Sequence, residues 1–520
     1  MRKSTRIIAN TVASYARLCF SAVSGFVTVP IALHTLGAAD YGLFAVVAGS
    51  LSFLMFINGA LTGGAQRHIA HSIGRGDSEE ADRWFSLSVC VHSLLGFFVL
   101  VAGWSASPVI LDHILRIPPT RSAAALWVYH LVVTAMVCDV ISTPYQALLM
   151  ARESIAVLSM FGIGGSLLLF AGTISLRFLP GDALKWYSAI YVASQLTILM
   201  GPMLFCISRF PACRRLPWPG VRRKRLVELL CFSGWNLFGA LSGPVRMQGP
   251  ALLLNHFVGP VANASYGIAM QVNGFTSNIS SGLLRATSPA IVKSEAAGKR
   301  RQMIQLANFS NKGAFLILWL AIAPILVNIR FVLKLWLSKP PADTGLFATL
   351  LLTATLIDQL TSGVIASVQA HGKIALYQVA MSTLTYMSVP VGYFLLARGL
   401  PAQSILYAVV ASAALAGVAR LGFAHRIFGL SVLDWLATVF VPCAAIAGAA
   451  IIAMKSVATF FQPSILETVA LFLVNGVCVL GLSWILALTS TERARITERL
   501  TDLTRRYRGY LWSTTPISIS

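Results

Sequence analysis

Charged residues are scarce in this chain of 520 residues, at 11% of the sequence, whereas soluble proteins carry about a quarter. Hydrophobic residues make up 56%, and the mean hydropathy is +0.74. These values exclude a soluble enzyme and a disordered chain. Acidic residues are the scarcest, with 18 Asp and Glu against 40 Lys and Arg. Because the basic residues lie in short loops between apolar runs, we read the excess as a signal of membrane orientation and expect no nucleic-acid partner.

Metal-binding and catalytic motifs are also missing. The eight cysteines form no CxxC pair and seven lie in apolar runs, so we expect neither a disulfide framework nor a metal site. His68 and His71 form an HxxH pair without the glutamate of a metalloprotease motif. The loops expected on the outer side are short, whereas a membrane-embedded glycan polymerase or ligase would present a longer one. We therefore expect a non-enzyme with no catalytic residue and no cofactor.

Long apolar runs recur along the whole chain. About 20 apolar residues in a helix cross the hydrocarbon core of a bilayer, and a backbone in lipid must satisfy its own hydrogen bonds. The alternating pattern of a membrane β-barrel is absent. We therefore expect an all-α, polytopic membrane bundle of about 14 transmembrane helices. The fourteen spans are 9–33, 41–64, 84–111, 122–149, 155–177, 183–207, 228–256, 261–289, 313–336, 344–370, 374–397, 402–422, 433–454 and 464–488.

Basic residues are distributed unevenly between these spans. With an inner N-terminus, the inner segments hold 28 Lys and Arg, including Arg420, and the outer segments hold 8. Cytoplasmic loops are enriched in Lys and Arg, so we expect both termini in the cytoplasm. The tail 491–520 carries apolar residues at helical spacing among arginines, which predicts an amphipathic helix on anionic membrane lipids. A simple solvated end is the alternative.

The two halves of the sequence carry similar markers at similar spacing. Asn10 precedes Tyr41 by 31 residues, and Asn236 precedes Tyr266 by 30. This predicts two pseudo-symmetric six-helix lobes with the substrate site between them, plus two extra helices. Coincidence between two helix starts is the alternative. The predicted domains are an N-lobe at 1–208, a basic cytoplasmic linker at 209–227, a C-lobe at 228–427, the last two spans at 428–490 and the tail at 491–520.

Polar residues inside the spans recur every three or four positions, which places them on one helix face. An arginine at mid-bilayer costs about 2.5–3.5 kcal/mol, so such residues should face a wet cavity or a carboxylate. The cationic candidates are Arg17, Arg246 and Arg285; the polar lining candidates are Asn10, Ser14, Ser21, Ser24, Gln271 and Asn278; and Asp139 and Asp358 are candidates for ion coupling or for structural pairing with the arginines. Asn263 and Asn278 match glycosylation acceptor sequences, which we discard because they lie in or near the membrane.

The start of the chain carries a set of loosely spaced motifs. They are Asn10, Ser14-Tyr15, Val29-Pro30, Leu36-Gly37-Ala38-Ala39-Asp40-Tyr41-Gly42 and Ala65-Gln66-Arg67. This stretch resembles the opening of lipopolysaccharide O-antigen flippases, in the polysaccharide-transport branch of the multidrug/oligosaccharidyl-lipid/polysaccharide (MOP) exporter superfamily. The resemblance implies a two-lobed bundle of twelve to fourteen spans with a central cavity. It also implies the movement of undecaprenyl-diphosphate-linked glycans across the bacterial inner membrane.

The leading hypothesis is therefore a flippase that works by alternating access on an anionic, lipid-linked glycan. Arginines can grip phosphate oxygens bidentately, and Ser, Asn and Gln suit sugar hydroxyls. Other polysaccharide assembly proteins are possible partners. The alternatives are a multidrug exporter of the same superfamily, a membrane-embedded glycan-processing enzyme and a scaffold without transport. A cavity for organic cations would favour acidic residues, whereas bases outnumber acids inside these spans.

Overall fold

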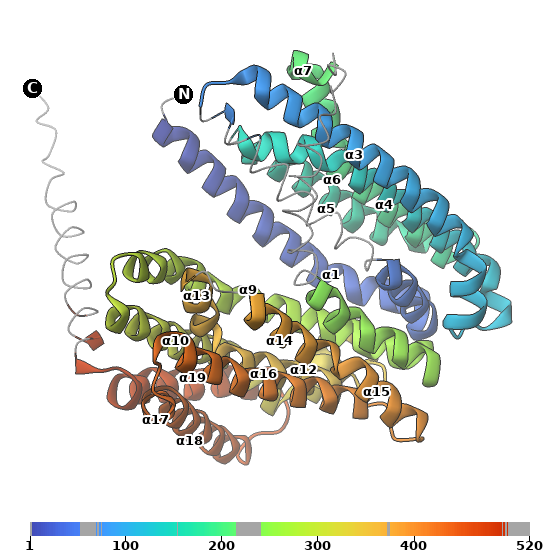
Figure 1. Ribbon diagram of the computed structural model, residues 1–520. Helices are drawn as coiled ribbons and strands as arrows, with labels where there is room; N and C mark the ends of the chain where they lie inside the picture. The colour runs from blue at the N-terminus through green and yellow to red at the C-terminus, as the bar shows by residue number, and fades with distance from the viewer. Residues whose placement is uncertain are drawn as a thin grey trace, which may run out of the picture. The chain divides into compact units, whose positions relative to one another are not determined.

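The computed structural model describes residues 3–51, 69, 72–73, 75–152, 154–214, 241–371, 375–490, 492–493 and 497. Helices dominate these residues, and no strand occurs among them (Figure 1). The prediction of an all-α polytopic membrane bundle is confirmed. Most of the predicted linker 209–227 and of the predicted tail 491–520 lies outside the described residues.

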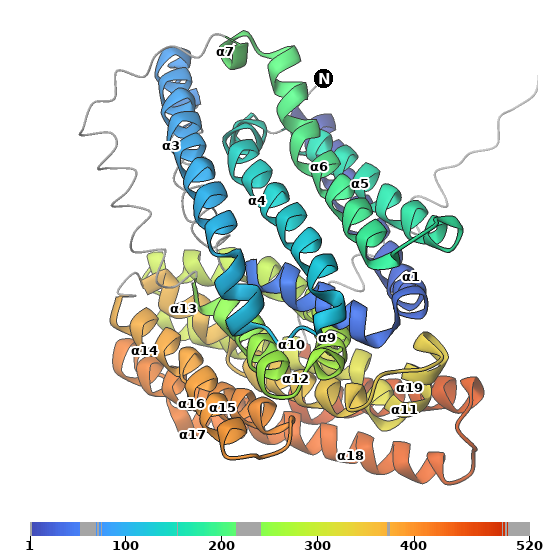
Figure 2. The same cartoon turned by 90° about the vertical axis from the view of Figure 1, so that its right-hand side faces the viewer.

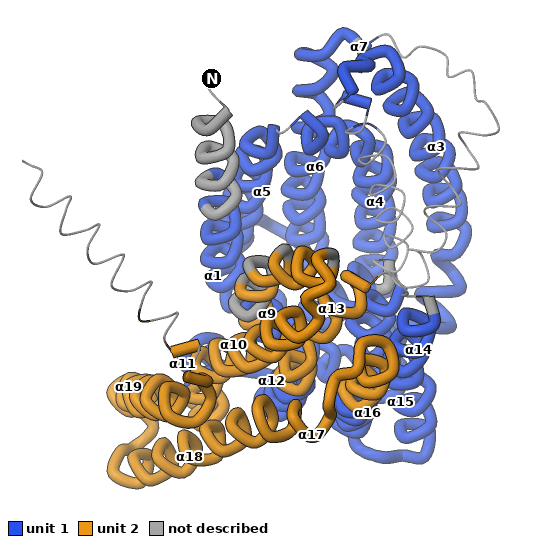
Figure 3. The backbone as a smooth tube through the Cα atoms, turned by 60° about the vertical axis from the view of Figure 1, so that its left-hand side comes forward, with its two compact units in different colours: residues 1–275, 332–354, 375–416 blue, residues 276–331, 355–374, 417–520 orange. Residues whose placement is uncertain are grey.

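The chain divides into two compact units (Figure 3). Unit 1 comprises residues 1–275, 332–354 and 375–416, and unit 2 comprises residues 276–331, 355–374 and 417–520. Unit 1 draws on both halves of the sequence, so this division does not test the predicted lobes 1–208 and 228–427. The internal repeat stays a prediction.

The first part of unit 1 is a bundle of long helices. In it α1 packs against α5, while α4 packs between α3 and α6 (Figure 2). Short π, 3-10 and α segments connect or end them, at Val109–Ile114 (η2), Pro119–Arg121 (η3), Leu176–Phe178 (η4) and Pro211–Arg214 (α7). The long helices are α1 (Lys3–Leu51), α3 (Ser78–Ser105), α4 (Ser122–Ala151), α5 (Ile155–Ser175) and α6 (Ala183–Arg209).

Helix α1 is interrupted at Gly37. The backbone there has φ 79° and ψ 166°, a conformation outside the helical region that glycine adopts without a Cβ clash. The predicted spans 9–33 and 41–64 meet at this break, so α1 contains the first and the beginning of the second.

The remaining helices follow the predicted spans closely. Within unit 2, α10 packs against α13, α18 and α19. Three helices, α9, α12 and α16, have residues in both units. The bounds are α9 (Pro260–Ala296), α10 (Arg300–Val327), α11 (Ile329–Leu337), α12 (Thr344–Gln359), α13 (Ser362–His371), α14 (Ala375–Tyr386), α15 (Ser388–Ala397), α16 (Ser404–Phe428), α17 (Val432–Trp435), η5 (Leu436–Phe440), α18 (Val441–Ala458), α19 (Ile465–Leu482) and η6 (Ser483–Ala487), and residues 241–257 form a further helical segment.

Ten helices in the described part of the chain are long and apolar enough to cross a membrane, or eleven if the bent pair α12–α13 forms one span. The bend between these two helices is 45°. The three predicted spans outside this set are 41–64, 228–256 and 261–289. The first continues α1 beyond Gly37, the second begins outside the described residues, and the third is the polar helix α9.

Candidate functional site

The polar stripe of α1 packs partly against α5 in unit 1. Ser21 Oγ lies 3.0 Å from Ser166 Oγ, and Ser24 Oγ donates to the Ser166 carbonyl at 3.1 Å. These two contacts satisfy hydroxyl groups that would otherwise face lipid without a partner. Part of the stripe that the sequence predicts as cavity lining is therefore a helix–helix contact.

Arg17 lies one turn before Ser21 on the same face of α1. Its guanidinium rests against the backbone of Gly162 in α5, because a Cβ added there would lie 2.4 Å from Arg17 Nε. The side chain is partly exposed, and within the described ranges it forms no ion pair. Glycine at position 162 is what leaves room for a cation beside α5.

Other groups connect α1 to α9 and α11. Gln271 Nε2 donates to the Gly25 carbonyl at 3.3 Å. Trp336 stacks on Phe26 with ring centroids 4.8 Å apart, and its Nε1 donates to the Phe26 carbonyl at 2.7 Å. The middle of α1 is thus held by hydrogen bonds from the predicted polar residue Gln271 and from a tryptophan that the sequence analysis did not single out.

A cavity of about 300 Å³ lies beside this contact, entirely within unit 1. It is enclosed by α1, the helical segment 241–257 and the first half of α9. Its lining contains amide, phenol and apolar side chains but no carboxylate and no ammonium or guanidinium group. The lining residues are Ala45, Met247, Gln248, Ala251, Asn263, Tyr266, Gly267, Met270 and Gln271.

Hydrogen bonds to backbone carbonyls fix two of the polar lining residues. Asn263 Nδ2 donates to the Gly42 carbonyl at 3.0 Å, and the Tyr266 hydroxyl donates to the Met247 carbonyl at 2.7 Å. Gly42 is required for this arrangement, because a Cβ there would lie 1.9 Å from the Pro260 carbonyl oxygen. The close approach of α1 to the start of α9 therefore sets the position of Asn263.

Arg246 is the cation nearest to the cavity in sequence, since it precedes the lining residue Met247. Its guanidinium interacts electrostatically with the Tyr266 side chain, and its side chain is partly buried. Positive charge in a low-dielectric wall acts over a longer range than in water. The cavity is thus neutral in its lining and positive at its border.

The two predicted carboxylates lie in different environments. Asp139 is a half-buried residue of α4 in unit 1, where its carbonyl accepts from the Ser142 and Thr143 hydroxyls. In unit 2, Asp358 Oδ1 lies 2.9 Å from Arg420 Nη1, which also donates to Thr361 Oγ1 at 3.0 Å. Asp358 therefore has an arginine partner, but not one of the predicted three.

Arg420 differs from its prediction in place as well as in role. The charge count assigns it to an inner segment, whereas it lies within α16 with a side chain only 11% exposed. Four of the predicted residues lie on α1 or α9 with side chains outside the described set, namely Asn10, Ser14, Asn278 and Arg285.

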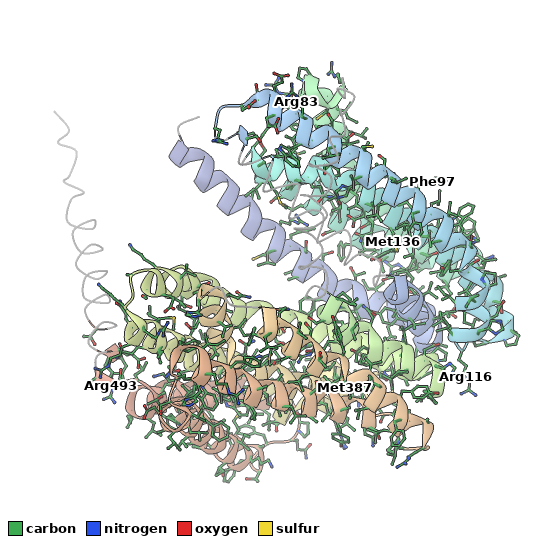
Figure 4. The ribbon with its side chains drawn as sticks, viewed as in Figure 1. Arg83, Phe97, Arg116, Met136, Met387 and Arg493 are labelled. Carbon is green, nitrogen blue, oxygen red and sulfur yellow. The ribbon has the colours of Figure 1, made fainter. Side chains whose placement is uncertain are left out.

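The two ends of the unit 1 bundle carry different charge clusters. Arg83 and Arg116, labelled in Figure 4, lie at opposite ends of it. Near Arg116, Arg121 bridges two carboxylates: its Nη1 lies 3.0 Å from Asp182 Oδ2, and its Nε donates to Asp40 Oδ1 at 2.9 Å. The sequence predicts all of these except Arg83 to lie on one side of the membrane, and the ion pairs place Asp40, Arg121 and Asp182 together.

Comparison with known proteins identifies a fold but no family. No protein-family model matches the chain, and no curated protein matches it. Among solved structures, an inward-facing multidrug resistance MATE family transporter of the MOP superfamily is 15% identical, with a TM-score of 0.67 over 79% of this chain and 97% of its own. Lipid II flippase MurJ in an inward closed conformation is 12% identical, with a TM-score of 0.69 over 92% and 98%.

A third structure, of a MOP superfamily transporter from Pyrococcus furiosus, is 14% identical with a TM-score of 0.53, over 81% of this chain and 94% of its own. The chain therefore has the fold of MOP superfamily transporters. This confirms the expected resemblance at the level of the superfamily fold, while the polysaccharide-transport branch stays a prediction.

Proposed function

We propose that this protein is a transporter that flips an undecaprenyl-diphosphate-linked oligosaccharide across the bacterial inner membrane. The glycan would be an O-antigen, capsule or exopolysaccharide unit. The observation that carries the proposal is the unit 1 cavity, which has an uncharged, amide-rich lining with Arg246 at its border. The fold supports it, because solved structures with this fold include a lipid II flippase as well as multidrug transporters.

The chemistry of the site matches an anionic, hydroxylated substrate. A diphosphate carries several oxygens that a guanidinium can bind through two parallel N–H groups. Arg17 and Arg246 lie in unit 1, and both side chains are partly exposed. Arg285 stays a third candidate on α9. The polyprenyl chain would remain in lipid while the head group crosses by alternating access.

The alternatives fit the described residues less well. A site for organic cations would present a carboxylate, and the cavity lining contains none. Asp358 is already neutralised by Arg420, which supports a structural role for it and leaves Asp139 as the candidate for coupling to protons or Na⁺. A glycan-processing enzyme would cleave or form a bond, which the test below detects directly.

The orientation of the protein belongs to the same proposal. The excess of basic residues in one set of loops favours cytoplasmic termini. The separation of Arg83 and Arg116 at opposite ends of unit 1 fits that assignment (Figure 4). The anionic glycolipid would then be loaded from the cytoplasmic face and released outside.

The decisive experiment is flipping by purified protein in liposomes. The probe is undecaprenyl diphosphate carrying a fluorescent oligosaccharide, whose outward exposure is followed by quenching with a membrane-impermeant reductant. Arg246→Glu should abolish flipping while the protein still inserts, because the substituted carboxylate repels the diphosphate. Arg246→Lys should retain part of it, since the charge survives but the bidentate geometry does not.

The matched control is Arg398→Glu, which makes the same change of charge at an exposed residue of unit 1 outside the cavity lining. It should leave flipping unchanged. Normal flipping by Arg246→Glu would overturn the role of Arg246. Recovery of a cleaved or extended glycan from the liposomes would favour the enzyme, and an inert wild type would favour the scaffold.

A further inference from the structure

Asn263 has a hydrogen-bonding group that the protein leaves unused. Its side chain is only 1% exposed and lines the unit 1 cavity. The orientation of its amide is settled by its partner, because the Gly42 carbonyl can accept only from the nitrogen. The Oδ1 atom on the other side has no hydrogen-bond partner among the described residues. A buried acceptor without a partner is unfavourable, so this atom calls for a donor from within the cavity.

The neighbours of Asn263 determine which donor fits. Gln248, Tyr266 and Gln271 also line the cavity, and an amide side chain can both donate and accept. A phosphate oxygen is itself an acceptor and cannot satisfy Asn263 Oδ1. A cation would find no carboxylate in the lining. A neutral molecule with several hydroxyl groups satisfies both the acceptor and the mixed amides.

We propose that the cavity is a subsite for one neutral sugar ring of the substrate, with Asn263 Oδ1 as acceptor for a sugar hydroxyl. This rests on the proposed function and divides its site in two. Arg246 binds the diphosphate, and Asn263 with the neighbouring amides binds the adjoining sugar. The order along the chain agrees with this division, since Arg246 directly precedes the lining residue Met247, just as the diphosphate directly precedes the first sugar.

Water is the competing occupant, because buried water commonly satisfies an isolated polar group. The two occupants differ in their consequences. A water-filled cavity has no affinity for a sugar, whereas a sugar subsite binds an uncharged glycoside without help from the arginines. The test therefore separates the sugar from the phosphate by using two probes, each of which carries only one of them.

The experiment measures binding to the full-length protein in lipid nanodiscs. The neutral probe is octyl β-glucoside below its micelle-forming concentration, with octanol as the control for the alkyl chain. The anionic probe is undecaprenyl diphosphate without sugar. Asn263→Leu should weaken glucoside binding by up to about tenfold, as expected for one hydrogen bond, and should leave undecaprenyl diphosphate unaffected. Arg246→Gln should have the opposite pattern.

Asn475→Leu is the matched control. Asn475 is also fully buried, donates its Nδ2 to a backbone carbonyl, that of Leu320 at 3.1 Å, and has an unpaired Oδ1, but it does not line the cavity. It should change the binding of neither probe. If Asn263→Leu fails to fold, Ala45→Leu fills the cavity from α1 without removing any amide, and it should abolish glucoside binding.

Each result has a defined meaning. Glucoside that binds no better than octanol, or equally well to Asn263→Leu or Ala45→Leu, overturns the sugar subsite and leaves the proposed flippase standing if undecaprenyl diphosphate binds through Arg246. Glucoside binding that depends on Asn263, without any binding of undecaprenyl diphosphate, supports the subsite and overturns the diphosphate role. Absence of binding by either probe overturns both proposals.

Discussion

The polar groups inside the two units are satisfied in different ways. In unit 1 the cavity residues are neutral, and Asn263 and Tyr266 donate to backbone carbonyls while an acceptor faces open volume. In unit 2, charged side chains pair with one another, as Asp358 does with Arg420 and Lys312 does with Glu492. A unit whose charges are internally paired fixes its own helices. A unit with an unused acceptor beside a cavity is prepared to bind something else.

The pairs of unit 2 show how a buried charge is tolerated in such a protein. The Lys312 side chain is only 4% exposed, and its Nζ donates to the Ala487 carbonyl at 2.7 Å and to Glu492 Oε2 at 2.9 Å. Asn328 Nδ2 donates to the buried carboxylate of Glu467 at 2.7 Å. Because desolvation of both partners opposes such pairs, their main effect is to penalise every arrangement that separates them.

The largest expected effect comes from breaking one of these pairs. Asp358→Leu leaves Arg420 largely buried without its carboxylate, so we expect a loss of about 3–5 kcal/mol of stability, as for other buried pairs. Asp358→Leu with Arg420→Met should recover most of it, since two apolar side chains replace the pair. Thermal unfolding in detergent measures both. A single variant that stays stable but no longer transports would instead favour ion coupling by Asp358.

A smaller effect is expected from moving Arg17 within unit 1. In Gly162→Ala the new methyl group would lie 2.4 Å from Arg17 Nε, so the guanidinium must move. Because this group ends a flexible side chain, stability should change by less than about 1 kcal/mol, while flipping in liposomes should fall. Gly164→Ala is the matched control, since its methyl group would lie at an ordinary 3.8 Å from Thr197 Cγ2. Equal flipping by both variants would remove Arg17 from the substrate path.

The smallest expected effect is the pH response of Glu295 in unit 2. The hydrogen bond from His371 Nδ1, at 2.8 Å, and the Arg300 guanidinium, at 3.1 Å, hold the pKa of Glu295 below its ordinary value, although burial opposes them. A depressed carboxylate pKa stabilises the fold above the unfolded value of about 4.3. That stabilisation is lost as the pH falls through the folded value.

Melting temperatures between pH 7 and pH 3 test this directly. His371→Ala should reduce the acid-sensitive stability more than Arg300→Ala, because the His371 hydrogen bond is the larger cause and Arg300 is 46% exposed. Both effects should stay below about 1 kcal/mol, as is usual for ion pairs near a surface. A larger effect of Arg300→Ala would show that the histidine does not hold the carboxylate.

The sequence predicted the helices well because their signal is local. Hydropathy alone placed α4 at 122–149, and the structure has it at Ser122–Ala151. Periodicity also placed Ser21 and Ser24 on one face of α1, but not the helix that this face meets, which is α5. Periodicity determines a direction from the helix axis, whereas a neighbour depends on how distant segments pack.

The same limit explains the site residues that were missed. Asn263 matched a glycosylation sequence and gave no other signal, because its importance lies in the approach of Gly42, which is 221 residues away. Arg420, the partner of Asp358, is 62 residues from it and sits near the end of a predicted span. The polar composition of 261–289 was the one local sign that α9 contributes to a site.

The Lys312–Glu492 pair also has a consequence for the synthesis of the protein. The lysine and its counter-charge are 180 residues apart. A ribosome that adds roughly 5–20 residues per second needs roughly 10–40 s to make the intervening chain. During that interval α10 has been made, but its lysine has neither Glu492 nor the Ala487 carbonyl. Insertion of α10 must therefore either wait for the last helices or be assisted by water and the insertion machinery, so the fold of unit 2 is completed only as translation ends.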